Sequence, residues 1–257
     1  MLRFVILGSS SSGNAILVYT DTARILVDNG FSFKRLAASL AQLDVAPESL
    51  DGVLITHEHA DHVRGLGPLA RKTGLPIYMT TGCAAALPSY VGVIPNLVCF
   101  ESGDTLSFNG LDAVSFNVSH DAADPVNYVF RAHGVSLGLA TDFGHCSHLT
   151  RARLAGANAL VVESNYCPDL LRQGPYPPQV QQRIRSRIGH LSNADVQELL
   201  RLLYHEALRL VVLCHISRDN NTPELACALA RAALGNAPVQ VVAAPADSLS
   251  PIYEVTS

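Results

Sequence analysis

The sequence of 257 residues has no tryptophan, only two methionines and few charged side chains, which make up 16% of the chain. Hydrophobic residues make up 48%, so a largely disordered chain is excluded, because disorder goes with high charge and few apolar residues. No apolar run approaches the roughly 20 residues that span a bilayer. The first residues, Met1–Gly8, lack the charged lead and long apolar stretch of a signal peptide. We therefore expect a soluble cytoplasmic protein without a membrane partner.

A strong excess of basic residues is also absent, since the formal net charge is −4 and the pI is about 6.2. Charge alone gives no reason to expect a nucleic-acid-binding protein, so such binding would need local patches. The six cysteines include no CxxC spacing, which argues against a structural zinc knuckle. A disulfide framework is equally improbable in a chain this long and apolar.

The most informative stretch is Thr56–His62, which directly follows the apolar run at 53–55. An apolar run that ends in a polar burst predicts a buried strand that ends at a functional site. Alternate side chains of an extended segment point the same way, so His57, His59 and Asp61 converge on one side. Imidazole and carboxylate groups are zinc ligands, and four of them in one loop exceed what one tetrahedral ion needs from a single segment. The stretch therefore predicts a site for two metal ions.

The order His-x-His-x-Asp-His resembles the signature of the metallo-β-lactamase superfamily, and later residues match the other ligands of that family in order. The resemblance implies two divalent metal ions. We expect Zn²⁺, and Mn²⁺ is the alternative because an oxygen-rich second site accepts either ion. Asp142 would bridge the ions, and Asp61 would also belong to the catalytic residues. The implied ligands are His57, His59, His120 and Asp142 for one ion, and Asp61, His62, Asp142 and His215 for the other.

Glu163 and His190 narrow the class of enzyme. Glu163 follows an expected strand, and His190 stands just before an expected helix. They are similar to the Glu and His that phosphodiesterase branches of the superfamily, such as the tRNA 3′-processing endonucleases, keep beside the metals. There the carboxylate orients the imidazole, which protonates the leaving alkoxide as a general acid. The alternative is a helix-cap region and a buried polar pair without a catalytic role.

Several basic and polar side chains near these motifs are candidate contacts for a substrate phosphate. Guanidinium groups match phosphate geometry, and the amides and hydroxyls of a serine-rich loop can meet an anion. The alternatives are a solvated helix face for the arginines and a flexible turn for the serines. The candidates are Ser11, Ser12, Asn14, Arg183, Arg185, Arg187 and Arg218.

The resemblance extends nearly end to end to the YycJ/WalJ-like group of small metallo-β-lactamase-fold DNA exonucleases. Its most distinctive piece is His-Ile-Ser-Arg-Asp-Asn-Asn-Thr-Pro-Glu at 215–224. It implies a binuclear phosphodiesterase, a 5′→3′ exonuclease preferring single-stranded DNA, in which metal-activated water attacks phosphorus and His190 protonates the departing 3′ oxygen. The group often has a histidine where this chain has Tyr166, and His145 and His148 match no ligand position. No role is assigned to these three residues.

The fold that the resemblance implies is an αββα sandwich, in which two packed mixed sheets carry helices on their outer faces. Only 73 residues separate Asp142 from His215, which leaves no room for a β-CASP insertion, so we expect residues 1–257 to form a single domain. Residues 8–14 are expected to form a loop. The expected strands are 2–7, 15–19, 24–28, 53–55, 77–79, 111–118, 126–131, 135–141, 159–162, 209–213 and 238–243, and the expected helices are 32–43, 62–72, 178–187, 192–204 and 222–234.

Two other functions stay open on the residues. The first is hydrolysis of a small thioester, lactam or cyclic nucleotide, which a comparison of phosphodiester and thioester turnover would distinguish. The second is a non-enzymatic, metal-binding regulatory protein with a decayed site. The complete ligand set argues against decay, because no implied metal position is substituted.

Overall fold

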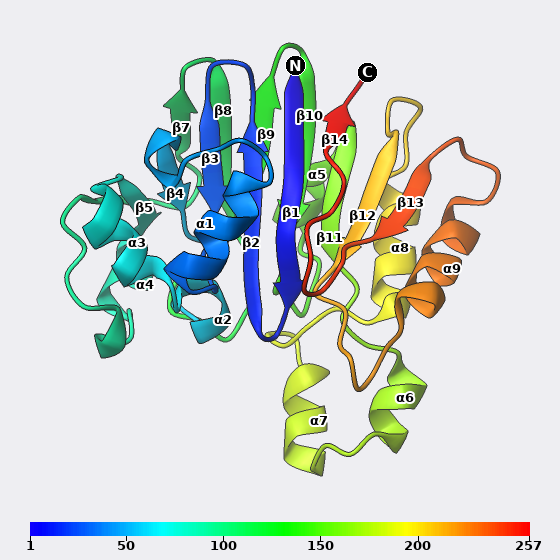
Figure 1. Cartoon of the computed structure of the whole chain (residues 1–257). Helices are drawn as coiled ribbons and strands as arrows, with labels where there is room; N and C mark the ends of the chain where they lie inside the picture. Colours follow the sequence, from blue (N-terminus) through cyan, green and yellow to red (C-terminus); the bar gives the residue numbers. More distant parts are fainter.

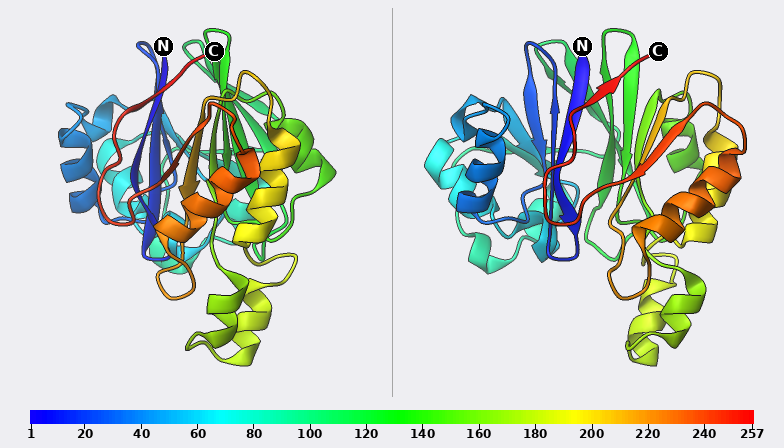
Figure 2. Two further views of the ribbon diagram at one scale, coloured as in Figure 1. Left: turned by 90° about the vertical axis from the view of Figure 1, so that its right-hand side faces the viewer. Right: turned by 45° about the vertical axis from the view of Figure 1, so that its right-hand side comes forward.

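Two seven-stranded sheets pack face to face in the computed structural model, which describes residues 1–257 (Figure 1). The largest hydrophobic cluster lies between the sheets and includes the fully buried rings of Phe4, Tyr128 and Phe130. Helices cover the outer face of each sheet (Figure 2). The expected αββα sandwich is confirmed.

The first sheet has the strand order β14-β1-β2-β3-β4-β5-β6. The strands from β14 to β3 pair antiparallel, and those from β3 to β6 pair parallel. The parallel strands at 24–27, 52–54 and 77–80 are largely buried and mostly apolar, whereas the edge strand at 97–100 is partly exposed. The strands are β1 (Leu2–Ser10), β2 (Gly13–Tyr19), β3 (Arg24–Val27), β4 (Gly52–Leu54), β5 (Ile77–Thr80), β6 (Leu97–Phe100) and β14 (Tyr253–Val255).

The second sheet repeats this plan with the order β13-β12-β11-β10-β9-β8-β7. Its strands from β7 to β10 pair antiparallel, and those from β10 to β13 pair parallel. The strands are β7 (Thr105–Phe108), β8 (Leu111–Asn117), β9 (Val126–Ala132), β10 (Val135–Ala140), β11 (Ala159–Glu163), β12 (Leu210–Cys214) and β13 (Gln240–Ala243).

Most of the helices bury an apolar side against one of the sheets. Leu36 and Leu69 pack on the first sheet, and Leu154 and Leu199 pack on the second. None of the helices combines the length and the apolar character needed to cross a membrane. They are α1 (Phe33–Ala41), α2 (Ala60–Val63), α3 (Leu66–Thr73), α4 (Thr81–Ala85), α5 (His148–Leu154), α6 (Pro168–Gln173), α7 (Pro178–Ile184), α8 (Asn193–Leu203) and α9 (Pro223–Leu234), with 3₁₀ turns at Pro47–Ser49 and Ser89–Val91.

The expected helix at 62–72 is wrong in one respect, because it is broken into α2 and α3. The Gly65 amide donates to the Asn29 carbonyl oxygen (2.9 Å), and the Asn29 amide donates to the His62 carbonyl oxygen (2.8 Å). These bonds draw the chain onto the turn after β3. A Cβ at Gly65 would lie 1.7 Å from the Phe31 carbonyl oxygen, so this close approach requires glycine.

The expected loop at 8–14 is also wrong, because β1 and β2 continue through it as a hairpin. Ser10 pairs with Gly13 across a two-residue turn, Ser11-Ser12, and the antiparallel ladder satisfies the backbone of the serine run. Sequence reasoning also missed the last strand, β14, which pairs with β1.

Functional groups gather at the carboxyl ends of the parallel strands, which is where α/β proteins build their sites. Asp28 follows β3, Asp142 follows β10 by one residue, Glu163 ends β11 and His215 follows β12. The helices α6 and α7 project beyond the sandwich at the same end (Figures 1 and 2).

Candidate metal centre

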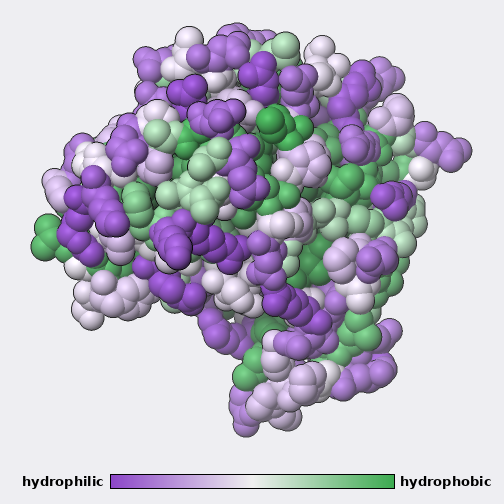
Figure 3. Space-filling model, viewed as in Figure 1, coloured by the Kyte–Doolittle hydropathy of each residue, from purple (hydrophilic) through white to green (hydrophobic).

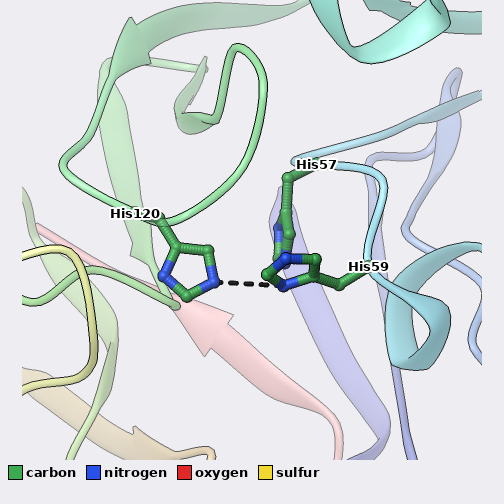
Figure 4. Close-up of side chains that lie close together, drawn as sticks. All are labelled: His57, His59 and His120. Carbon is green, nitrogen blue, oxygen red and sulfur yellow. Dashed lines mark hydrogen bonds between the residues drawn. The ribbon is translucent and has the colours of Figure 1, made fainter. Parts of the chain in front are cut away.

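Three histidines from two loops turn their imidazole nitrogens toward one another (Figure 4). His57 and His59 lie in the loop after β4, and His120 lies in the loop after β8. The Nε2 atom of His120 is 3.3 Å from Nδ1 of His59. One nitrogen from each ring lies within 4.8 Å of the others, so the trio could hold one metal ion.

The second nitrogen of each of these rings has a partner in the protein. His57 Nδ1 is 3.0 Å from the Thr56 hydroxyl, His59 Nε2 is 3.2 Å from the Asp121 carbonyl oxygen, and His120 Nδ1 is 3.1 Å from the Gly189 carbonyl oxygen. Such contacts orient histidine ligands and set their tautomer.

The Nε2 atom of His57 is buried and has no hydrogen-bond partner. A buried nitrogen without a partner is costly unless it binds something else. Burial, with nearby His62, holds the pKa of His57 well below its usual value, so the ring stays neutral. Neutral imidazole is the form that coordinates a metal, and this orphaned nitrogen therefore fits a divalent ion.

A second group forms around Asp142, whose carboxylate faces two further histidines. Its Oδ2 lies 3.3 Å from His62 Nε2, and its Oδ1 lies 2.9 Å from His215 Nδ1. The Asp61 carboxylate is 3.4 Å from His62 and 3.9 Å from His215. Asp142 also lies within the group formed with His57 and His62, so it adjoins both clusters.

Charge dominates this second group in the metal-free chain. Burial favours the neutral forms, but Asp142 and its acidic neighbours outweigh it and raise the pKa of His215 to about 10 and that of His62 well above its usual value. The two histidines likewise hold the pKa of Asp142 well below its usual value despite its burial. The raised pKa values favour the charged form of both rings, and a metal must displace the extra proton from each ring to bind.

These shifts predict that the melting temperature depends on pH in the metal-free protein and much less in the metal-loaded protein. The folded pKa of His215, about 10, exceeds the unfolded value near 6.5, so its charge stabilises the metal-free chain fully below about pH 6.5. That contribution is lost as the pH rises through 10. The melting temperature should therefore fall between pH 7 and 10 in chelator, and bound metal should remove the fall because coordination needs the neutral ring. A parallel fall in both states would contradict this.

Asp28 is a functional residue that sequence reasoning missed, because it was assigned only to a turn. Its Oδ1 accepts the Thr56 amide (2.8 Å), and its Oδ2 accepts the Thr56 hydroxyl (2.8 Å) and lies 2.8 Å from His62 Nδ1. This carboxylate therefore orients His62 and leaves Nε2 facing Asp61 and Asp142. The only signal available was that Asp28 stands at the end of an expected strand.

Replacing Asp28 by asparagine should weaken one bound ion by about 10- to 100-fold, because a ligand loses the partner that orients it. Titration with Zn²⁺ and measurement of bound metal would test this. The matched control is Asp21→Asn, which removes an exposed carboxylate paired with Arg3. Equal metal affinity in the two variants would mean that Asp28 has only a structural role.

The backbone is strained at three of these positions. The φ angles of Asp28, Asp142 and His215 are 59°, 53° and 49°. These angles lie in the left-handed region, which residues other than glycine rarely adopt. Each lies just after a strand of the site. Strain of this kind persists where the surrounding structure fixes it, and it tends to accumulate at functional sites.

Glu163 and His190, far apart in the sequence, form a direct pair. His190 Nδ1 lies 3.0 Å from Glu163 Oε2, while Glu163 Oε1 accepts the amides of Phe143 (2.8 Å) and Leu191 (3.1 Å). Burial alone would raise the pKa of Glu163, but His190 and His215 lower it, so the group stays a carboxylate. The Nε2 atom of His190 forms no hydrogen bond in the protein, and His190 is one of the residues that line a small cavity.

The loop at 186–189 that carries His190 packs closely on Gly144. A Cβ at Gly144 would lie 2.4 Å from the Ser186 carbonyl oxygen and 2.5 Å from the Gly189 amide nitrogen. The Gly189 carbonyl oxygen in turn contacts His120. One loop therefore positions His190 and a member of the histidine trio together.

The candidate phosphate contacts differ in their surroundings. The Asn14 amide is buried and donates to Asp61 Oδ2 (3.1 Å), while Ser11 and Ser12 lie exposed at the hairpin tip. Arg183 donates to Asp121 (2.6 Å), and Arg218 pairs with Asp247. Arg185 and Arg187 are exposed and form no ion pair, so they are the arginines most available to a ligand.

The residues without an assigned role lie outside the metal-like groups. His148 contacts Arg151, one turn along α5. Tyr166 is buried beside Glu163-Ser164-Asn165 and forms an isolated bridge with Ser192. His145 belongs to no group that could hold a metal.

The chain belongs to the metallo-β-lactamase superfamily. Residues 23–216 match the family described as the beta-lactamase superfamily domain. Together with the His and Asp clusters, this membership implies divalent metal ions.

Among individual proteins, the chain is similar to exodeoxyribonuclease YycJ of Bacillus anthracis, with 40% identity over 88% of this chain and 86% of that protein. It is 38% identical to exodeoxyribonuclease WalJ of Streptococcus pneumoniae over 87% of this chain and 85% of that protein. The crystal structure of YhfI from Bacillus subtilis, a metallo-β-lactamase-fold protein, superposes with a TM-score of 0.76 over 97% of this chain and 98% of that one, at 16% identity. The chain is thus a metallo-β-lactamase-fold hydrolase related to bacterial exodeoxyribonucleases, as its motifs predicted.

Proposed function

We propose that this protein is a binuclear metal-dependent exonuclease that degrades single-stranded DNA from the 5′ end, and that its substrate partner is therefore DNA. The observation that carries the proposal is the Glu163–His190 pair, which forms one group with Asp142 and His215 and lies close to His120 of the histidine trio. A phosphodiester has a poor alkoxide leaving group, so its cleavage needs a proton donor. Thioester and lactam hydrolysis give no comparable reason for this pair. The names of the relatives at 38–40% identity favour the same reaction.

The proposed ligands are His57, His59, His120 and Asp142 for one ion and Asp61, His62, Asp142 and His215 for the other. When bound, the ions lower the pKa of the attacking water and neutralise charge on the phosphate. Zn²⁺ suits these donors, and Mn²⁺ is the alternative. The carboxylate of Asp61, whose pKa is lowered by His62 despite burial, stays ionised beside the reacting phosphate.

His190 acts as the general acid in this proposal, and Glu163 is the residue that positions it. The carboxylate accepts a hydrogen bond from the Nδ1–H group of the ring, which leaves Nε2 without a protein partner. A protonated His190 can then give the Nε2 proton to the departing 3′ oxygen. The carboxylate orients the ring for this step.

Exposed groups around this end of the sandwich would bind the phosphates of the strand. The first candidates are Arg185 and Arg187, together with Ser11 and Ser12 at the hairpin tip. Three further candidates would bind phosphate only if the substrate replaced their present partners; these are Asn14, Arg183 and Arg218. We also infer that residues 1–257 form one domain, since one core cluster is shared by both sheets.

The decisive experiment incubates metal-loaded protein with 5′- and 3′-labelled single-stranded DNA, duplex DNA and RNA, and follows product length. The proposal expects mononucleotide release from the 5′ end of single-stranded DNA. Bis(p-nitrophenyl) phosphate and a small thioester are compared in parallel. Thioester turnover without cleavage of any nucleic acid would replace this proposal with a small-molecule hydrolase.

A further inference from the structure

A small cavity adjoins the metal centre where the α6–α7 pair meets the loop after β12. Its volume is about 120 Å³, on the order of four water molecules. Three of its eight lining residues are apolar, and the other five are polar. The lining includes Tyr176, Ile184, Ile216, Ser11, Asn165 and His190.

The outer wall of this cavity is fixed to the body of the protein. The Tyr176 hydroxyl donates to Asp219 Oδ2 (2.7 Å), and the Cys167 amide donates to the Asn220 carbonyl oxygen (2.8 Å). The helices α6 and α7 form a separate lobe beside the site, with Leu170 and Val180 more than a third exposed (Figures 2 and 3). The cavity therefore exists before a ligand arrives.

The position of His190 indicates which part of a nucleic acid would enter. Its free Nε2 must lie beside the oxygen that leaves phosphorus, so the nucleotide that carries this oxygen occupies the adjoining space. Cleavage from the 5′ end makes the terminal nucleotide the leaving group. The base is the part of that nucleotide with flat apolar faces, which suit the tyrosine and isoleucine walls.

The charge of the α6–α7 lobe also favours binding of a nucleic-acid strand. Residues 168–189 carry four arginines and one aspartate, whereas the whole chain has a net charge of −4. This local positive charge would attract a polyanion, and the cavity lies next to it.

We propose that the Tyr176–Ile184–Ile216 cavity is a subsite for the base of the leaving 5′-terminal nucleotide. The proposal rests on the exonuclease function proposed above. On this proposal the terminal base enters the cavity unpaired, as it would from a single strand. Tyr176 is thus a specificity-determining residue that contacts the base, and its hydroxyl holds the wall in place.

The test pairs a change in the protein with a change in the substrate. One single-stranded DNA carries a normal 5′-terminal nucleotide, and a second carries an abasic one at the same place. Base stacking on an aromatic ring gives an expected loss of roughly 5- to 150-fold in kcat/KM when either partner is removed. Tyr176→Ala should therefore slow cleavage of the normal strand by that factor and leave cleavage of the abasic strand nearly unchanged.

Two further variants separate the ring from general effects on folding. Tyr176→Phe keeps the ring and should retain most of the activity, and Tyr90→Ala, which removes a tyrosine that is 54% exposed outside the site, should match the wild type. Equal losses on both strands for Tyr176→Ala, or a loss in Tyr176→Phe as large as in Tyr176→Ala, would overturn the subsite. If the wild type hydrolyses bis(p-nitrophenyl) phosphate but cuts neither strand, the exonuclease proposal itself fails and the subsite fails with it.

Product binding gives a second measurement that needs no change in turnover. Thymidine 5′-monophosphate should inhibit the wild type more strongly than deoxyribose 5-phosphate, which lacks the base. Tyr176→Ala should remove this difference. Equal inhibition by both compounds in the wild type would contradict a base-binding cavity.

Discussion

Replacing His190 by alanine is expected to slow cleavage of DNA by about 10²- to 10⁴-fold, the usual contribution of a general acid. Metal content should stay at the wild-type level, because the proposed ligand set does not include this residue. A substrate with a good leaving group needs little protonation, so turnover of bis(p-nitrophenyl) phosphate should fall much less. The comparison requires single-turnover rates on both substrates, together with measurement of bound metal.

Two variants complete this experiment. Glu163→Gln keeps the shape of the partner but removes its charge, so part of the same selective loss should appear. His148→Ala removes an exposed histidine at the start of α5 and should leave both rates unchanged. Equal losses on the two substrates would show that His190 positions the phosphate, and loss of an ion would show that it is a ligand.

Replacing Asp142 by asparagine is expected to abolish turnover on every substrate. This carboxylate adjoins both histidine groups, so each ion should bind more than about 100-fold more weakly, since loss of even a ligand's partner costs about 10- to 100-fold. The metal-free chain should also lose stability. Removing one member of a buried ion pair typically costs about 3–5 kcal/mol, because the remaining charges are left without a partner.

Asp61→Asn is the matched comparison, because Asp61 contacts the histidines of only one of the two groups, His62 and His215. This variant should weaken one ion and leave the ion of the histidine trio bound. Metal titrations and thermal unfolding in chelator would measure both effects. Two tightly bound ions in Asp142→Asn would exclude the bridging role.

The residues that could be predicted from the sequence are those whose signal is local. The His-rich loop follows an apolar run and contains four donors within seven positions, and Asp142 and His215 follow apolar strands in the same way. The sheets follow from the same apolar runs. The αββα arrangement itself came from the resemblance, because strand patterns alone do not specify which strands pair.

The features that could not be predicted depend on contacts between distant segments. Asp28 looked like a turn residue, and only the packing of β3 beside β4 brings it to His62. The break at Gly65 is fixed by bonds to Asn29, although Gly65, Gly67 and Pro68 were a local helix-breaking signal that the sequence reading did not use. Gly144 likewise carries no sign of the loop at 186–189 that packs on it. Tyr176 belongs to a proline-rich stretch that predicts only a surface loop.

The repeated plan of the two sheets has a consequence for how an active molecule comes into being. One half supplies the loop at 57–62, the other supplies Asp142 and His215, and the His215 amide is secured by the Ser9 hydroxyl, 206 positions away. Contacts so distant along the chain form slowly, because a large loop must close before they contribute. During synthesis, the histidine trio would be available long before β12 emerges. The complete site, and with it the proposed nuclease activity, would then form only after the second half has docked.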